Sequence, residues 1–238
     1  MRTLYKPIHR FFTGYYTILL VSLVLLFILR PYDRGGTYLA VWKGCLTVAF
    51  FSAVFNCKHQ KHIRILSLIL GIPTFVLTWV NLYDRNELLL IINAVFTVLF
   101  ITCAAASILY DVILRAKVTL ETLRGVICAY FMIAFAFAYM YYLIEFILPG
   151  TIHFEGRDVS IHVFNHFLSE MLYFSFVTLL SIGYGDIVPV SSIAQSFSII
   201  EGVIGHFYVA ILVARLVAVY SMREEKHLLL KEFEHKNL

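Results

Sequence analysis

The sequence has few charged residues and few cysteines for its length, and each scarcity excludes a class of protein. Only 14% of the 238 residues are charged, whereas 61% are hydrophobic, and the mean hydropathy is +0.83. A water-soluble domain of this size needs far more polar surface. The four cysteines, Cys45, Cys57, Cys103 and Cys128, lack the spacing of a disulfide framework or metal site. We therefore expect an all-α membrane protein in which the cysteines are small apolar residues.

Catalytic groupings are also missing. The sequence has no paired carboxylates, no nucleophile with a nearby base and no phosphate-binding loop in a plausible setting, so we do not expect an enzyme. The net charge of +4 does not indicate nucleic-acid binding, because the charges lie in short segments between apolar blocks. His153, His162 and His166 could bind a metal, but solvated surface histidines are far commoner, and no cofactor is expected.

Long apolar blocks are what the sequence has in abundance. A helix needs about 20 apolar residues to cross a hydrocarbon core of roughly 30 Å. We predict six such spans, at about 13–30, 37–56, 63–81, 88–110, 124–148 and 193–220. One further apolar segment, 166–180, is too short to span and fits a re-entrant helix. Because re-entrant backbone is tolerated only when it is buried in protein or lines a water-filled cavity, this segment indicates a pore.

The basic residues predict the orientation of the chain. With six spans, fourteen of the nineteen lysines and arginines lie on the side of the two termini, which places both termini in the cytoplasm of a cell whose plasma membrane the chain crosses. The predicted parts are a four-helix transmembrane domain over residues 1–110, an interfacial linker helix over 111–123, a pore domain over 124–221 and a short cytoplasmic helix over 222–238.

A glycine-containing motif follows the short apolar segment directly. It reads Ser181-Ile182-Gly183-Tyr184-Gly185-Asp186. A dehydrated cation needs oxygen ligands in place of water, and successive backbone carbonyls that point the same way can supply them. Glycines allow the backbone conformations that this arrangement requires.

The motif resembles the signature of the pore-loop potassium channels, usually written T-V-G-Y-G-D. Ser181 replaces the usual threonine and Ile182 the usual valine. Serine keeps the hydroxyl that would serve as the innermost ion ligand, so selectivity for K⁺ should survive, although the lost methyl would loosen that site. The resemblance implies a homotetramer in the lipid bilayer, because one chain carries one pore loop and supplies one wall of the filter. The sequence leaves open whether an unknown ligand gates the channel.

The resemblance also assigns roles to individual residues. Tyr184 would pack its ring outward against neighbouring pore helices, and Asp186 would brace the outer mouth. The ion-binding residues of the filter would be Ser181, Ile182, Gly183, Tyr184 and Gly185, with K⁺ held at the first four. The filter would be supported by Tyr173, Phe174, Thr178 and Asp186.

The last predicted span would line the cavity below the filter. Gly205 lies nineteen residues after Asp186, where relatives have a glycine considered a hinge; it could instead allow the pore helix to approach closely. The candidate cavity and gate residues are Gly205, His206, Val209, Val213 and Val217, the last four spaced to share one helical face. His206 could titrate near neutral pH and reduce the current on acidification, or could stay neutral and hydrogen-bonded.

Two further features of the spans bear on mechanism. Glu201 is ionisable inside a span, and we expect it to form hydrogen bonds behind the filter rather than contact an ion. Residues 88–110 contain no basic residue, so the fourth span has none of the charges that sense voltage. We predict a potassium channel with little voltage dependence. The alternatives are a weakly selective cation channel and a non-conducting six-span transporter or receptor, although no inverted repeat supports a transporter.

Overall fold

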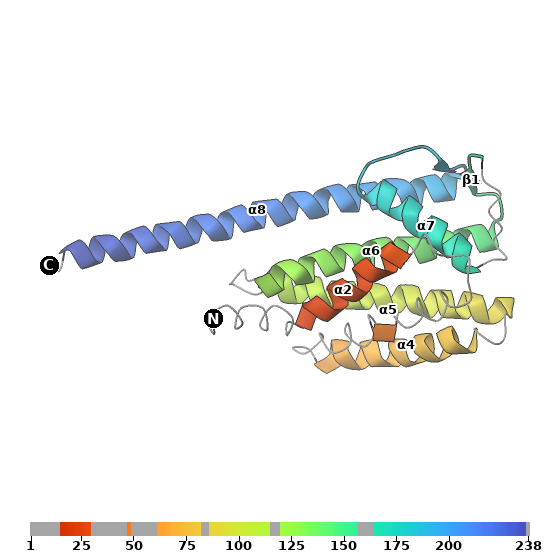
Figure 1. Cartoon of the computed structure of the whole chain (residues 1–238), viewed down its shortest axis with the longest axis horizontal. Coiled ribbons are helices and arrows are strands. Elements are labelled where there is room, and N and C mark those ends of the chain that lie inside the picture. Colours follow the sequence, from red (N-terminus) through yellow and green to blue (C-terminus); the bar gives the residue numbers. More distant parts are fainter. Residues whose placement is uncertain are drawn as a thin grey trace, which may run out of the picture.

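The structure is a computed structural model that describes residues 15–29, 47–48, 61–81, 86–114, 120–156 and 164–236. It is mostly helical (Figure 1). The elements, labelled as in Figure 1, are α2 (Tyr15–Leu29), α4 (Lys61–Val80), α5 (Glu87–Leu114), α6 (Leu120–Ile147), β1 (Ile152–Phe154), α7 (Phe164–Leu179), β2 (Ile187–Pro189) and α8 (Ser192–Lys236).

Three helices are long and apolar enough to cross a membrane. They are Glu87–Tyr110 in α5, Thr122–Ile147 in α6 and Ser192–Arg215 in α8. Shorter apolar stretches occur at Tyr16–Leu26 and Ile65–Val80, where the first and third spans were predicted. The predicted span at 37–56 lies outside the described residues apart from residues 47–48. The bounds of helix α7 agree with those of the predicted re-entrant segment, 166–180, to within two residues at each end.

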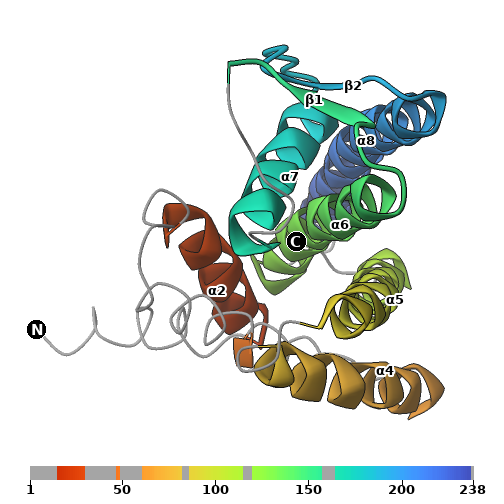
Figure 2. The same cartoon turned by 90° about the vertical axis from the view of Figure 1, so that its right-hand side faces the viewer.

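Helix α6 lies at the centre of the molecule (Figure 2). It packs against α5, α7, α2 and α8. Small residues are buried along it, among them Cys128, Ala129, Ala134 and Ala138. Small side chains let helix backbones approach closely within a membrane, where burial of apolar surface gives no driving force.

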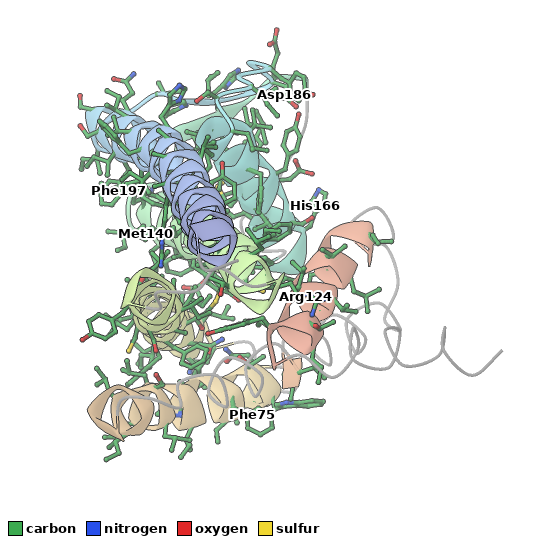
Figure 3. The ribbon with its side chains drawn as sticks, turned by 90° about the vertical axis from the view of Figure 1, so that its left-hand side faces the viewer. Phe75, Arg124, Met140, His166, Asp186 and Phe197 are labelled. Atoms are coloured by element: carbon green, nitrogen blue, oxygen red, sulfur yellow. The ribbon has the colours of Figure 1, made fainter. Side chains whose placement is uncertain are left out.

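The N-terminal part of α6 holds α2 through a short set of contacts. The ring of Tyr16 lies over Gly125, where an added Cβ would be 3.2 Å from the ring. Arg124 Nη1 donates a hydrogen bond to Thr17 Oγ1 at 2.9 Å, and Figure 3 shows Arg124 beside α2. Cys128 Sγ donates to the carbonyl oxygen of Tyr16 at 3.6 Å. These contacts join the first apolar helix directly to the pore region of the same chain.

Two helix boundaries differ from the predicted division of the chain. Residues 111–114 are the end of α5 and residues 120–123 the beginning of α6, while 115–119 lie outside the described residues. Helix α8 continues through the predicted terminal helix without a break. Because no proline or glycine follows Gly205 before Lys236, the sequence contains no strong signal to end the helix. Figure 1 shows the C-terminal half of α8 projecting beyond the other helices.

Candidate ion-conduction site

Helix α7, the predicted pore helix, ends in a pattern that sets the backbone of the first residue of the predicted filter. Ser181 N donates to the carbonyl of Thr178 and Ile182 N to the carbonyl of Val177, both at 2.9 Å. This pair of bonds is the Schellman motif, which places the residue after the helix in the left-handed region. Ser181 accordingly has a φ of 56°. Serine has no branch at Cβ, so it adopts this φ with less strain than a β-branched residue would.

Positive φ then recurs at every second residue. Gly183 has a φ of 63° and Gly185 a φ of 81°, whereas Ile182 and Tyr184 are not in this region. An added Cβ at either glycine would meet no atom within 4 Å in the single chain, so the need for glycine is conformational. A strand of uniform φ points its carbonyls to alternate sides. Alternation of the sign of φ can turn successive carbonyls to one side, as a cation filter requires.

The predicted aromatic supports have different surroundings. The ring of Tyr173 stacks on that of Tyr184, with centroids 6.4 Å apart and planes at 6°. Phe174 instead points into the helix packing, where it meets Tyr141 edge-on at 4.9 Å. Within this chain, Tyr173 therefore contacts the filter and Phe174 fixes the pore helix against α6.

A small two-stranded sheet holds the C-terminal end of the predicted filter, and the sequence did not predict it. Strand β1 pairs antiparallel with β2, so that His153 lies opposite Val188. At one end of the sheet, Glu155 N donates to the carbonyl of Asp186 at 2.9 Å, and at the other Val190 N donates to the carbonyl of Thr151 at 2.8 Å. The loop after α6 is thereby tied to the residue that follows the filter. Figure 3 shows Asp186 at the edge of the molecule far from Phe75 of α4.

The carboxylate of Glu145 fixes the loop that leads into this sheet. It accepts hydrogen bonds from the backbone N–H groups of Gly150 at 2.7 Å, Thr151 at 2.9 Å and Ile152 at 2.9 Å. The hydroxyl of Thr151 donates a fourth bond at 2.6 Å. Sequence reasoning missed this residue, although an acidic side chain at the end of an apolar span, five residues before a glycine, is a usable signal.

The inner end of the filter rests on α8. A Cβ added to Gly205 would lie 2.2 Å from the carbonyl oxygen of Leu179, and the same oxygen accepts a hydrogen bond from Tyr130 of α6 at 3.2 Å. Ser181 Oγ and His206 Nδ1 are 3.3 Å apart and share a hydrogen bond. This geometry supports the close-approach explanation for Gly205, which the sequence left open beside a hinge.

The other candidate cavity residues lie on the exposed surface of α8. The side chains of His206, Val209 and Val213 are exposed in the single chain. Val217 lies in α8, but its side chain is outside the described part of the structure. The structure therefore brings His206 to the filter and leaves the valines on a helix face that the rest of the described chain does not cover.

Glu201 lies behind the filter in a network that spans three helices. Its side chain is fully buried, with 0% exposure. Tyr141 Oη of α6 donates to its Oε2 at 2.7 Å, and Ser175 Oγ of α7 is hydrogen-bonded to its Oε1. Ser175 Oγ also lies 2.8 Å from the carbonyl oxygen of Ala134 in α6.

The described residues contain no group of three or more His, Cys, Asp or Glu side chains that could hold a metal ion.

Comparison with known proteins finds one family and two curated relatives. Residues 125–222 match a protein family described as "Ion channel". Two curated relatives are more particular. The chain is 43% identical over 65 residues to the "Two pore potassium channel c" of Oryza sativa subsp. japonica, covering 27% of this chain and 14% of the relative. It is 32% identical over 116 residues to the "Two-pore potassium channel 3" of Arabidopsis thaliana, covering 49% and 25%.

Residues 125–222 are thus similar to an ion-channel family, and both relatives are named as potassium channels. Together with three helices long and apolar enough to cross a membrane, these matches support a membrane protein. The chain spans a quarter or less of the length of the two plant relatives. No solved structure matches the chain.

Proposed function

We propose that this chain is one subunit of a homotetrameric channel that passes K⁺ passively across the plasma membrane. The observation that carries the proposal is the segment Ser181–Gly185, whose φ is positive at alternate residues. The segment follows a helix too short to span and lies between α6 and α8, which can both cross a membrane. The permeant ion would replace its hydration shell with oxygen atoms of the filter.

The ion sites in this proposal are built from backbone carbonyls and one hydroxyl. Carbonyls of Ile182, Gly183 and Tyr184 would form the central sites, and the Ser181 hydroxyl the innermost one. Gly185 and Asp186 complete the outer end, where the bond from Glu155 holds the backbone. K⁺ is the preferred ion in this proposal because the signature is that of potassium channels and both plant relatives are named as such.

Assembly into a tetramer is supported by the surfaces that one chain leaves uncovered. The filter residues from Leu180 to Gly185 are all exposed, and Tyr184 is 68% exposed. Helix α8 exposes large apolar side chains at Ile199, Val203, Phe207 and Ile211. The sequence contains one filter motif, so four copies around one axis would close the ion pathway. Lipid and neighbouring subunits would cover the remaining apolar surface.

A weakly selective cation channel is a second candidate, and the observation that favours it is Ser181. Its side chain lacks the methyl of threonine, so the innermost site is less tightly packed around its hydroxyl.

In either kind of channel, opening would depend on a stimulus other than voltage, and both termini would lie in the cytoplasm. An unidentified gating ligand fits this proposal.

Ion flux from liposomes tests the proposal. The purified chain should dissipate a K⁺ gradient much faster than a Na⁺ gradient, and equal rates would establish the weakly selective alternative. Absence of flux for both ions would reject a channel. Gly183→Ala should abolish most of the flux, because a left-handed backbone costs a residue with a Cβ about 1–2 kcal/mol in each subunit. Its tetramer content, measured by size-exclusion chromatography with light scattering, separates filter damage from failed assembly.

A further inference from the structure

The hydrogen bonds around Glu201 can be counted against the protons available to form them. Ser175 Oγ has one proton but lies within hydrogen-bonding distance of two oxygens, the Ala134 carbonyl and Glu201 Oε1. The carbonyl can only accept. When the serine proton is donated to Ala134, the bond between Ser175 and Glu201 needs a proton from the carboxyl group. On the other oxygen, Oε2, the proton comes from Tyr141 at 2.7 Å. Tyr141 Oη also lies 3.3 Å from Ser198 Oγ, but that contact is longer, and Ser198 donates its own proton to the Ala194 carbonyl at 2.9 Å.

The surroundings of Glu201 favour the same protonation. The side chain is fully buried, and its hydrogen-bond partners in the described part of the chain are two neutral hydroxyls. A buried charge is costly unless it is paired, and an unpaired group tends to neutralise instead. The surroundings of Glu145 are different and favour a charged carboxylate. Four groups donate hydrogen bonds to it, and three of these are backbone N–H groups, which can only donate.

We propose that Glu201 is a neutral carboxylic acid that positions the pore helix behind the filter. Its O–H donates to Ser175, Ser175 donates to the Ala134 carbonyl, and Tyr141 donates to the second carboxyl oxygen. The chain of bonds joins α6, α7 and α8 without touching an ion. Ser175 lies six residues before Ser181 on the helix that ends at the filter, so the network fixes where that filter begins.

This inference rests on the proposed function, since it assigns a positioning role in the same filter. It predicts that the carboxyl group matters as a donor and acceptor of hydrogen bonds and not as a charge. Glu201→Gln preserves both abilities, because the amide NH₂ can donate to Ser175 and the amide oxygen can accept from Tyr141. Glu201→Ala removes both.

The protonation is tested by infrared difference spectroscopy of the full chain in liposomes. A carbonyl stretch of a protonated carboxylic acid should be present in the wild-type protein, absent from Glu201→Gln and retained in Glu155→Gln, which alters an exposed carboxyl. An identical spectrum for wild type and Glu201→Gln overturns the proposal. This measurement requires no conduction.

The positioning is tested by the ratio of K⁺ to Na⁺ flux. Glu201→Gln should keep the wild-type ratio, whereas Glu201→Ala and Ser175→Ala should lower it roughly threefold to tenfold, the range that one net hydrogen bond represents. The proposal is overturned when Glu201→Gln loses selectivity as Glu201→Ala does, or when Ser175→Ala keeps the wild-type ratio. Ser175→Ala and Tyr141→Phe decide the matter when Glu201→Ala does not assemble.

The two hypotheses fail in different ways. A wild-type protein that conducts no K⁺ rejects the channel, while the infrared band still reports the state of Glu201. A wild-type protein that conducts K⁺ selectively, together with an unchanged ratio in Ser175→Ala, leaves the channel intact and rejects the positioning role.

Discussion

Two glycines three residues apart on α8 differ in what surrounds them. A Cβ at Gly205 would lie 2.2 Å from the Leu179 carbonyl oxygen, a backbone atom at the end of the pore helix, whereas a Cβ at Gly202 would meet nothing within 4 Å. Since backbone cannot move aside as a flexible side chain can, Gly205→Ala should force α7 and α8 apart. Overpacking of this kind costs about 1–3 kcal/mol.

Liposome flux of the two alanine variants measures this difference. Gly205→Ala should lose most of its K⁺ flux, and Gly202→Ala should match the wild type while gaining up to about 1 kcal/mol of helix stability. Thermal unfolding followed by circular dichroism gives the stability of both. Normal conduction in Gly205→Ala would show that conduction depends neither on the close contact with Leu179 nor on a glycine hinge at this position.

For individual residues, the sequence predicts backbone conformation better than it predicts which side chains are in contact. The two glycines of the motif predicted unusual backbone conformations, and Gly183 and Gly185 do have positive φ; the role of Ser181 through Asp186 in a filter stays a prediction. The sequence did not distinguish Tyr173, which stacks on Tyr184, from Phe174, which packs on Tyr141. Adjacent residues on a helix point in different directions, and which direction meets the filter depends on how α7 lies against α6.

Among the elements, the β1–β2 pair makes the clearest prediction about the outer mouth. Glu155 bonds to Asp186 and Val190 bonds to Thr151, so the period of two in an antiparallel ladder makes His153 and Val188 a hydrogen-bonded pair. His153→Pro removes an N–H from the ladder, and proline also restricts the residue before it. We expect the loosened outer mouth to reduce K⁺ flux by roughly fivefold, the value of about one net hydrogen bond.

The matched control is His153→Ala, which keeps the backbone N–H and removes only an exposed side chain. It should conduct as the wild type does. An equal loss of K⁺ flux in both variants would assign the effect to the imidazole and not to the ladder. Wild-type flux in both variants would mean that the sheet does not support the filter.

The lengths of these elements explain which of them the sequence could predict. Helices α5, α6 and α8 contain 18-residue windows of mean hydropathy 1.9 or more, the length and composition that a membrane-spanning helix needs. Strands β1 and β2 have three residues each, too few to establish a period of two. Their pairing depends on α6, α7 and the filter returning the chain to the same place, which is information about tertiary structure.

For the molecule as a whole, the distribution of buried surface separates two kinds of membrane helix. In α6, 61% of the most apolar window is buried within one chain, but in α8 only 11% is buried. Helix α6 therefore organises the subunit, and α8 has apolar surface on most of its circumference that other molecules must cover. The proposed tetramer places this surface partly against neighbouring copies and partly around the ion pathway.

The response of the whole molecule to voltage follows from where its charges lie. Helix α5, from Glu87 to Leu114, contains no lysine or arginine, and the buried Arg124 at the start of α6 is held by Thr17. Each elementary charge that crosses the membrane contributes about 2.3 kcal/mol per 100 mV, roughly a fiftyfold change in the open-to-closed ratio. Without such a charge, the conductance in symmetric K⁺ should change less than about twofold over 100 mV.

Currents across planar bilayers, recorded in symmetric K⁺ over positive and negative potentials, measure this dependence. A steep conductance–voltage curve would require charges that move. Arg124→Gln then provides a decisive comparison, because it removes the buried basic side chain while leaving an amide that can still donate to Thr17. A curve that flattened in this variant would make Arg124 the moving charge. A flat curve in both proteins is the expected result, since the guanidinium of Arg124 is buried and hydrogen-bonded to Thr17 of α2 and contributes to the packing of α2 on α6.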